Sequence, residues 1–224
     1  MGRFAEAVVF EVESQGLGNI REGLANTLIL LISIETVLHQ RSFESPLAQE
    51  ISKRFETVRA FIHNASEWAA ESEGQNDATI MQKMLDVHVM APYLLNQQCG
   101  ELLMRHGMDY GYADIIHMSD FVATTGSRKH IAYAASKAAI ENLSLSYAKK
   151  FAPWVKVNNI APALLMFNQD DDSDYREKAR TKSLLGIVPG ESEGVTAVKY
   201  LLESRYLTGK TLALDGGRHL AQAS

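Results

Sequence analysis

The stretch Asp114-Ile115-Ile116-His117-Met118, taken with the helical pattern of residues 131–151 and the apolar run Val155 to Ile160, decides the fold class. The two apolar runs are predicted to be strands, and the segment between them is predicted to be a helix. A strand that is apolar at successive positions is buried on both faces, as in a parallel sheet covered by helices. This region therefore indicates a parallel β-α-β unit.

The same alternation extends in both directions along the chain. Because strand-like and helical segments alternate without an internal repeat or a linker, we expect an α/β fold with a mainly parallel, doubly wound sheet in a single domain, residues 1–224. Ligands of such sheets bind beyond the carboxyl ends of the strands. The other expected strands are 7–10, 57–62 and 211–214, and the other expected helices are 23–34, 78–104 and 194–202.

Composition excludes several classes of function. The formal net charge of −5 argues against a nucleic-acid-binding protein, whose binding face is normally basic. The one cysteine, Cys99, excludes a disulfide within the chain and a thiolate metal cluster, and no metal site is expected. The apolar run 28–32 is far shorter than the roughly 20 residues of a membrane span, and Glu6 stands where a signal peptide is apolar. We therefore expect a cytoplasmic protein with no membrane partner.

Tyr133 and Lys137 form the strongest chemical pattern in the sequence. A spacing of four places both side chains on one face of a helix. A neighbouring ammonium lowers the pKa of a phenol by favouring the phenolate, so this pair can act as a proton donor to a carbonyl or an imine. The same pattern also occurs as an exposed pair on an amphipathic helix, so its meaning depends on the surrounding residues.

Small and polar residues follow the predicted strands in a characteristic order. Asn64-Ala65-Ser66 follows one strand, Ser119-Asp120 the next, and Pro162 the third, while Asp215-Gly216-Gly217 follows the last. Together with Tyr133 and Lys137, this ordered set resembles the short-chain dehydrogenase/reductase family over about residues 55–219. The resemblance implies a Rossmann-like fold and hydride transfer from NADPH.

Finer features resemble the pteridine reductases within that family. Asp120 stands where most members carry the catalytic serine, thirteen positions before Tyr133, and Trp68 follows Asn64-Ala65-Ser66 as the aromatic residue that stacks on a pterin ring. His88 takes the place of a helical asparagine. The segments around these residues are most similar to the bacterial dihydromonapterin reductases, also called alternative dihydrofolate reductases. The resemblance implies reduction of a dihydropterin, either dihydromonapterin or dihydrofolate.

The resemblance also implies a role for each site residue. Tyr133 would be the proton donor or relay, and Lys137 would bind the nicotinamide ribose and lower the pKa of Tyr133. Asp120 would accept hydrogen bonds from the pterin or take part in protonation, although it could instead cap a turn; Trp68 could equally be a core aromatic. The residues implied to bind cofactor are Gly16, Gly18, Asn64, Ala65, Ser66, Tyr133, Lys137 and Pro162, and those implied to bind substrate are Trp68, Ser119, Asp120 and Tyr133.

The amino-terminal part, residues 1–54, departs from the family pattern. The family opens with a glycine-rich turn at which backbone N–H groups meet a pyrophosphate. Here Gly16 and Gly18 keep two of its glycines, but Glu11 and Val12 replace the first two residues of the turn. Gly18 and Asn64 are 64 − 18 = 46 positions apart, whereas the three strands and three helices that the family places in this interval need about 60. We therefore expect a shortened or divergent first βαβ region, which is consistent with a divergent variant, a truncation or an altered reading of the gene.

Two other functions are consistent with the sequence. A damaged cofactor cradle would favour a non-catalytic relative that acts as a binding partner. A general carbonyl reductase of the same fold is favoured if Ser119, and not Asp120, faces the substrate. The small residues Ala134, Ala135, Ala138 and Ala139 permit close approach of helices, so a homodimer or a homotetramer is expected.

Overall fold

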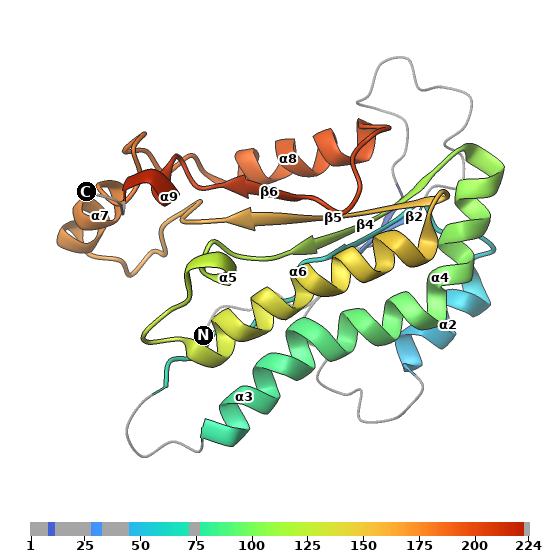
Figure 1. Cartoon of the computed structure of the whole chain (residues 1–224), viewed down its shortest axis with the longest axis horizontal. Helices are drawn as coiled ribbons and strands as arrows, with labels where there is room; N and C mark the ends of the chain where they lie inside the picture. Colours follow the sequence, from blue (N-terminus) through green and yellow to red (C-terminus); the bar gives the residue numbers. More distant parts are fainter. Residues whose placement is uncertain (1–8, 12–27, 33–44, 72–76, 222–224) are drawn as a thin grey trace.

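The computed structural model describes residues 9–11, 28–32, 45–71 and 77–221 (Figure 1). In these residues one six-stranded sheet has the order β1-β2-β3-β4-β5-β6, which is also the order along the chain. The strands are β1 (Val9–Glu11), β2 (Leu28–Ile32), β3 (Ala60–His63), β4 (Ala113–Met118), β5 (Val155–Pro162) and β6 (Thr211–Leu214). β1 pairs antiparallel with β2, and every later pair is parallel.

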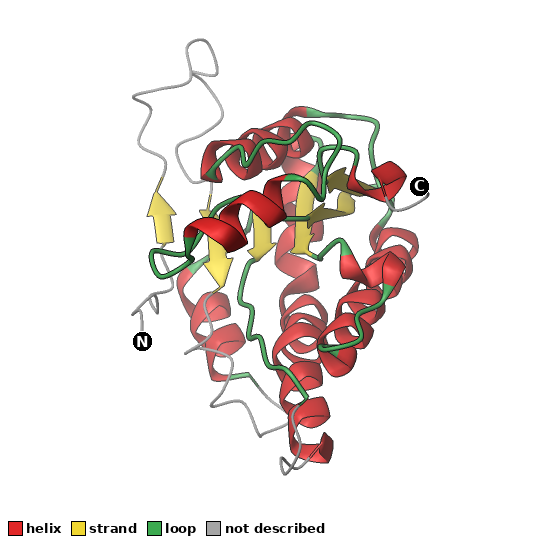
Figure 2. Ribbon diagram, turned by 90° about the vertical axis from the view of Figure 1, so that its left-hand side faces the viewer, coloured by secondary structure: helices red, strands yellow, loops and turns green. Residues whose placement is uncertain are grey.

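Helices cover both faces of the sheet. One face packs against α2 (Pro46–Arg54), α4 (Ala91–Tyr110) and α6 (Ile131–Phe151), and the other packs against α8 (Glu191–Glu203). Figure 1 shows α8 on one side of the strands and α4 with α6 on the other, and Figure 2 shows the strands side by side among the helices. The remaining helices are α3 (Asp77–Leu85), the π-helical turn η1 (Asp86–Met90), α5 (Val122–Thr125), α7 (Ser173–Arg180) and α9 (Arg218–Ala221).

The doubly wound α/β architecture is therefore confirmed. The long helical pattern of residues 78–104 corresponds to the continuous run of α3, η1 and α4. Within the part of the chain that the structure describes, no helix is both long and apolar enough to cross a membrane.

The helix expected over residues 23–34 is wrong, because Leu28–Ile32 forms strand β2. β2 pairs in parallel with β3, with Leu30 opposite Phe61. Five consecutive apolar residues fit a buried strand as well as a buried helical turn, and periodicity cannot separate the two. Pairing with a strand about thirty positions away decides the structure here.

The expected glycine-rich turn lies outside the described residues, as do Gly16 and Gly18. The described residues between positions 18 and 64 contain two strands and one helix, namely β2, α2 and β3. The expected first strand, residues 7–10, overlaps β1, of which residues 9–11 are described.

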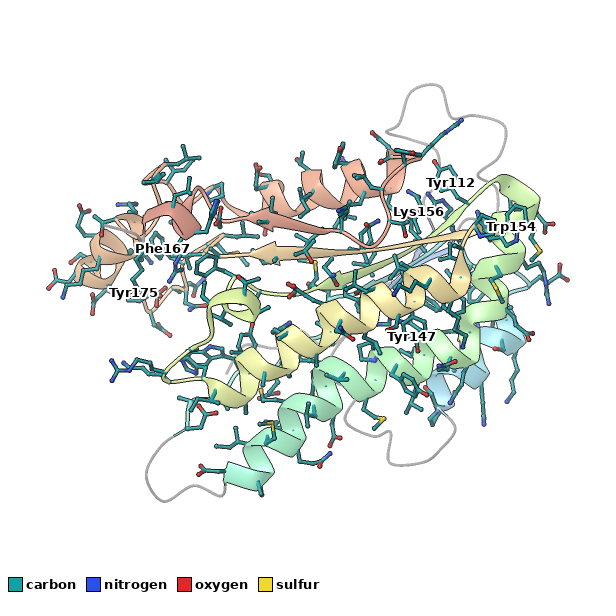
Figure 3. The ribbon with its side chains drawn as sticks, in the orientation of Figure 1. Tyr112, Tyr147, Trp154, Lys156, Phe167 and Tyr175 are labelled. Carbon is teal, nitrogen blue, oxygen red and sulfur yellow. The ribbon has the colours of Figure 1, made fainter. Side chains whose placement is uncertain are left out.

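A buried charge cluster fixes the amino ends of the central strands. Asp114, which is fully buried on β4, forms ion pairs with Arg59 and with Lys156 (2.9 Å). The ring of Tyr112 contacts both cations, with its centroid 4.7 Å from Arg59 Cζ and 4.5 Å from Lys156 Nζ. Figure 3 shows Tyr112 and Lys156 together at this end of the sheet. The second positive charge is balanced by carbonyl groups at the carboxyl end of α8, since Lys156 also donates to the Leu201 carbonyl (2.8 Å).

Replacing Asp114 by alanine is expected to lower the free energy of unfolding by about 3–5 kcal/mol, because the buried Lys156 and the partly buried Arg59 lose their carboxylate. Urea unfolding followed by circular dichroism measures the loss. The matched control is Glu101→Ala on α4, which removes an exposed carboxylate and should change stability by less than about 0.5 kcal/mol. Equal losses in the two variants would contradict the assigned role of Asp114.

Candidate active site

The side chains of Asp120 and Tyr133 meet beyond the carboxyl end of β4. Tyr133 lies in the first turn of α6, and its hydroxyl donates a hydrogen bond to Asp120 Oδ2 (2.9 Å). The other carboxylate oxygen, Oδ1, accepts from the backbone N–H of Val122 (2.9 Å) at the start of α5. Asp120 therefore caps a turn and binds the phenol at the same time, and the cap fixes the direction in which its second oxygen points.

This contact changes the expected electrostatics of Tyr133. Burial and the adjacent Asp120 carboxylate raise the pKa of Tyr133 above its ordinary value. The expected lowering by Lys137 is thus wrong for this structure, because the Lys137 ammonium donates instead to the Met118 carbonyl (2.8 Å) and lies 5.5 Å from the centroid of the Tyr133 ring. The phenol is therefore held protonated, and in this contact it is a weaker acid than a free tyrosine.

Ser119 points away from this pair. Its hydroxyl donates to Glu141 Oε1 (2.6 Å) and lies 3.4 Å from the Lys137 carbonyl oxygen. The side chain is 3% exposed. Of the two residues that follow β4, it is therefore Asp120 whose side chain contacts the phenol.

His88 links the loop after β3 to α6. The Ser136 hydroxyl donates to the Tyr133 carbonyl (2.7 Å), so His88 Nδ1 carries a proton and donates to Ser136 Oγ (2.8 Å). His88 Nε2 then accepts from the Glu67 backbone N–H (3.2 Å) and from the Ser66 hydroxyl (3.1 Å). Burial, aided by the Lys137 charge, lowers the pKa of His88 to about 3, so the ring is neutral. The loop containing Ser66 is thereby held against the helix that carries Tyr133.

Trp68 lies on the surface beside the start of α6. Its side chain is 66% exposed, and its ring centroid is 4.5 Å from that of His130. The Glu71 carboxylate accepts from the backbone N–H groups of Ile131 (2.9 Å) and Ala132 (2.7 Å), so it caps α6 and anchors the segment that follows Trp68. Trp68 is therefore not a core aromatic, and its ring is accessible to a flat ligand.

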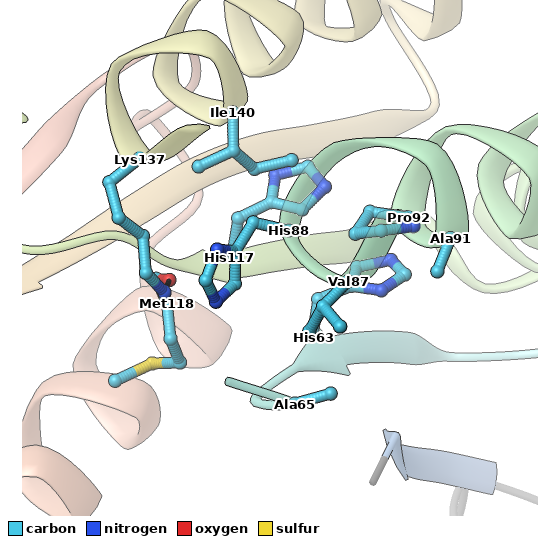
Figure 4. Close-up of a pocket in the computed structure, with 10 residues that line it drawn as sticks. All are labelled: His63, Ala65, Val87, His88, Ala91, Pro92, His117, Met118, Lys137 and Ile140. Carbon is cyan, nitrogen blue, oxygen red and sulfur yellow. Dashed lines mark hydrogen bonds between the residues drawn. The ribbon is translucent and has the colours of Figure 1, made fainter. Parts of the chain in front are cut away.

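A small hollow lies beside Lys137 at the carboxyl ends of β3 and β4 (Figure 4). Its lining includes Ala65, His88 and His117. Asn64 is exposed at the end of β3, while the Pro162 carbonyl, at the end of β5, accepts from the Phe121 N–H (2.9 Å). Among the residues that the structure describes, no group of three or more His, Cys, Asp or Glu side chains could hold a metal ion.

Four buried histidines make stability depend on pH. Burial lowers the pKa of His63 and of His106 to about 4, that of His88 to about 3 and that of His117 well below its usual 6.5. Below pH 6.5 the unfolded chain binds protons that these rings bind in the folded chain only near pH 4 or below. The stability contributed by the neutral rings is thus complete above pH 6.5 and is lost as pH falls, by about 1.4 kcal/mol per pH unit for each histidine.

Urea unfolding at a series of pH values tests this expectation. Between pH 6.5 and 4, His63→Gln should reduce the slope of the unfolding free energy against pH by about 1.4 kcal/mol per pH unit, which corresponds to one bound proton. A slope that His63→Gln does not change would show that this ring is not buried in its neutral form.

Comparison with known proteins decides the family. The family model described as "Enoyl-(Acyl carrier protein) reductase" matches residues 38–219. A dihydromonapterin reductase from Klebsiella pneumoniae is 51% identical over 173 residues, which cover 77% of this chain and 71% of that protein. The chain belongs to the short-chain dehydrogenase/reductase family. Residues 1–37 lie outside the match, so the family assignment rests on the part of the chain that carries Asp120 and Tyr133.

Two further relatives agree with this assignment. The dihydromonapterin reductase of Escherichia coli strain K12 is 50% identical over 173 residues, with the same coverage of 77% and 71%. The crystal structure of FolM alternative dihydrofolate reductase 1 from Brucella canis, complexed with NADP, superposes with a TM-score of 0.68 at 26% identity. This superposition covers 80% of the present chain and 71% of the Brucella chain. The fold of the family is thus shared well beyond the sheet itself.

Two site contacts were not predicted from the sequence. Glu141, which accepts from Ser119, lies eight positions after Tyr133 and four after Lys137, so helical spacing could have placed it on the same face. Glu71 precedes α6 by about sixty positions, and no local signal relates it to the helix that it caps. The first contact was readable from periodicity, whereas the second depends on the tertiary fold.

Proposed function

We propose that this protein reduces a dihydropterin, dihydromonapterin or dihydrofolate, with NADPH as the hydride source. The observation that carries the proposal is the hydrogen bond from the Tyr133 hydroxyl to Asp120, with Ser119 directed elsewhere. The names of the 50–51% identical relatives support the pterin class, and the NADP complex of the Brucella protein supports the cofactor.

The residues at the nicotinamide end fit such a cofactor. The hollow beside Lys137 opens at the carboxyl ends of parallel strands, where this fold class binds nucleotides. The Lys137 ammonium has three N–H groups, and in the described residues the Met118 carbonyl is the acceptor for one of them. Lys137 would bind the ribose hydroxyls, and Asn64, Ala65, Ser66 and Pro162 would line the nicotinamide end. Gly16 and Gly18 remain the proposed pyrophosphate contacts.

NADPH supplies a hydride to the pterin ring when it is bound. The task of the chain's own residues is then to deliver a proton to the ring nitrogen. Tyr133 holds that proton at its hydroxyl, since burial and Asp120 raise its pKa. Asp120 Oδ2 can accept from an N–H group of the pterin once the phenol turns towards the substrate, and a proton from water would restore the Tyr133 hydroxyl after the transfer. Trp68 provides an accessible aromatic face for the flat bicycle.

The geometry favours this chemistry over general carbonyl reduction. A carbonyl oxygen needs two hydrogen-bond donors, which a serine and a tyrosine hydroxyl provide in that class of enzyme. Here Ser119 is buried and donates to Glu141, and the partner of Tyr133 is a carboxylate that accepts hydrogen bonds. A site with one phenol donor and one carboxylate acceptor matches a ring that carries both N–H groups and basic nitrogens.

A two-step experiment tests the proposed function. Titration of the protein with NADPH, followed by the change in nicotinamide fluorescence, measures whether residues 1–54 still permit cofactor binding. Turnover of dihydromonapterin and dihydrofolate is then followed by NADPH absorbance. We expect saturable binding and turnover of at least one dihydropterin. Absence of NADPH binding would instead favour the non-catalytic relative, and turnover of simple ketones alone would favour the carbonyl reductase.

We also propose that the protein assembles as a homodimer or homotetramer through α6. Ala135 and Ala138 are exposed on this helix, as are Ile131 (58%) and Leu145 (46%), so an apolar stripe with small residues faces outward. Sedimentation at micromolar concentration is expected to show a species of two or four chains. A species of only 24.8 kDa would contradict this assembly.

A further inference from the structure

Four buried polar side chains form a continuous hydrogen-bonded chain beneath the candidate site, the His63–Asn96–His117–Ser144 chain. His63 Nε2 on β3 lies 2.8 Å from Asn96 Oδ1 on α4, Asn96 Nδ2 lies 3.1 Å from His117 Nε2 on β4, and His117 Nδ1 lies 2.7 Å from Ser144 Oγ on α6. None of the four residues is more than 5% exposed. The two imidazole rings stack with centroids 4.8 Å apart, and Figure 4 shows both beside the hollow near Lys137.

The amide of Asn96 determines the direction of every bond in this chain. Its oxygen can only accept, so His63 donates from Nε2; its nitrogen can only donate, so His117 accepts at Nε2. His117 then carries its proton on Nδ1 and donates to Ser144, whose own hydroxyl donates to Asn159 Oδ1 (2.6 Å). Burial keeps both rings neutral, as their lowered pKa values show. One protonation pattern therefore satisfies the whole chain.

The chain joins the three elements that carry the site. His63 immediately precedes the loop 64–66, and His117 lies three positions before Asp120. Ser144 follows Tyr133 by eleven positions, which is about three helical turns, so both lie on the same face of α6. Because Asn96 bonds to both histidines, a single amide connects the cofactor-side loop, the Asp120 strand end and the Tyr133 helix.

We propose that Asn96 is a positioning residue, which holds these three elements in the register needed for hydride and proton transfer. Asn96 does not relay protons itself, since an amide between two neutral rings has no proton to give up without losing a bond. The inference rests on the reductase activity of the site and not on which dihydropterin is the substrate.

The variant Asn96→Leu tests the proposal, because it removes both amide contacts while keeping a buried side chain of similar size. Turnover is expected to fall on the order of 10²-fold, because small misplacements of the reacting groups slow a reaction by about this factor. The matched control is Asn158→Leu: Asn158 is also fully buried, but it bonds to the Leu207 carbonyl (2.9 Å) and the Lys210 N–H (3.1 Å) on the other face of the sheet. The control should lose stability and keep its turnover.

The variant Asn96→Asp provides a spectroscopic signature that a merely structural role would not give. A carboxylate accepts from both rings, so His117 must move its proton to Nε2 and accept from Ser144 at Nδ1. Imidazole ¹⁵N resonances are expected to show Nε2–H for His63 and Nδ1–H for His117 in the parent protein, and Nε2–H for both in the variant. Any other tautomer pattern in the parent protein would overturn the assigned direction of the chain.

A measurement without substrate separates this inference from the proposed function. The groups facing Lys137 are His88, His117, Asp120 and the Tyr133 ring, and burial lowers the pKa of Lys137 to about 8. If Asn96→Leu loosens this packing and admits water, the pKa of Lys137, measured by ¹³C NMR, should rise towards 10.5, while Asn158→Leu should leave it near 8. The inference would be overturned if Asn96→Leu left turnover or the Lys137 pKa unchanged. It would also be overturned if Asn158→Leu changed both quantities as much as Asn96→Leu does. If the parent protein reduces no dihydropterin, the proposed function fails and the Lys137 measurement still decides the role of Asn96.

Discussion

Replacing Tyr133 by phenylalanine is expected to reduce dihydropterin turnover by about 10²-fold or more, because the variant lacks the group that holds the transferable proton. The ring remains to fill its buried position, so the fold should persist. NADPH affinity should be nearly unchanged, since Lys137 and the loop 64–66 keep their contacts. Steady-state turnover and an NADPH fluorescence titration measure the two quantities separately.

Tyr147→Phe is the matched control for this change. Tyr147 lies on the same helix, is 3% exposed and donates its hydroxyl to the Tyr93 carbonyl (2.9 Å), so the substitution removes an equally buried phenol oxygen. Figure 3 shows Tyr147 on α6, away from the carboxyl ends of the strands. It should cost stability of about 1 kcal/mol and leave turnover intact. If Tyr133→Phe keeps its rate, or loses cofactor affinity in proportion to rate, Tyr133 is not the proton donor.

The parts of the fold that could be predicted from sequence are those with a long or repeated pattern. α4 and α6 are twenty or more residues long, and the apolar strands β4 and β5 flank α6, so segment length and the alternation with strands identify these helices. Leu28–Ile32 is too short for either period to dominate, and its pairing with β3 is a tertiary effect. The antiparallel pairing of β1 likewise had no signal in the sequence.

The site shows the same division between local and tertiary information. The family resemblance, in which the position thirteen residues before the tyrosine carries the catalytic serine, predicted that Asp120 and Tyr133 belong to one site, and the structure brings them into contact. The interval of four between Tyr133 and Lys137 predicted a shared face but not where the ammonium points. The Met118 carbonyl decides that, and burial together with the Asp120 carboxylate reverses the expected shift in the pKa of Tyr133.

The second large effect is expected at Asp120. Asp120→Ala leaves the Tyr133 hydroxyl, the Val122 N–H and the bound pterin without their acceptor, which costs about 1–3 kcal/mol and corresponds to a roughly 5- to 150-fold loss of turnover. NADPH affinity should stay nearly unchanged. Asp120→Asn keeps an oxygen that can cap the turn but removes the negative charge, so it separates the cap from the chemistry. A normal rate in the asparagine variant would reduce Asp120 to a turn cap.

The neighbouring serine supplies the contrast that distinguishes the two reaction classes. Ser119→Ala removes only a hydroxyl that donates to Glu141, so its effect on dihydropterin turnover should be mild. Asp120→Ser restores the residue common in the family, and it should lose pterin activity and gain a little activity on simple ketones, because a hydroxyl donor then faces the substrate beside Tyr133. Both rates are measured by NADPH absorbance with a dihydropterin and with a ketone. The opposite result would be an inactive Ser119→Ala and a nearly normal Asp120→Ala. It would require Ser119 to turn from Glu141 towards the substrate, and it would make the protein a carbonyl reductase.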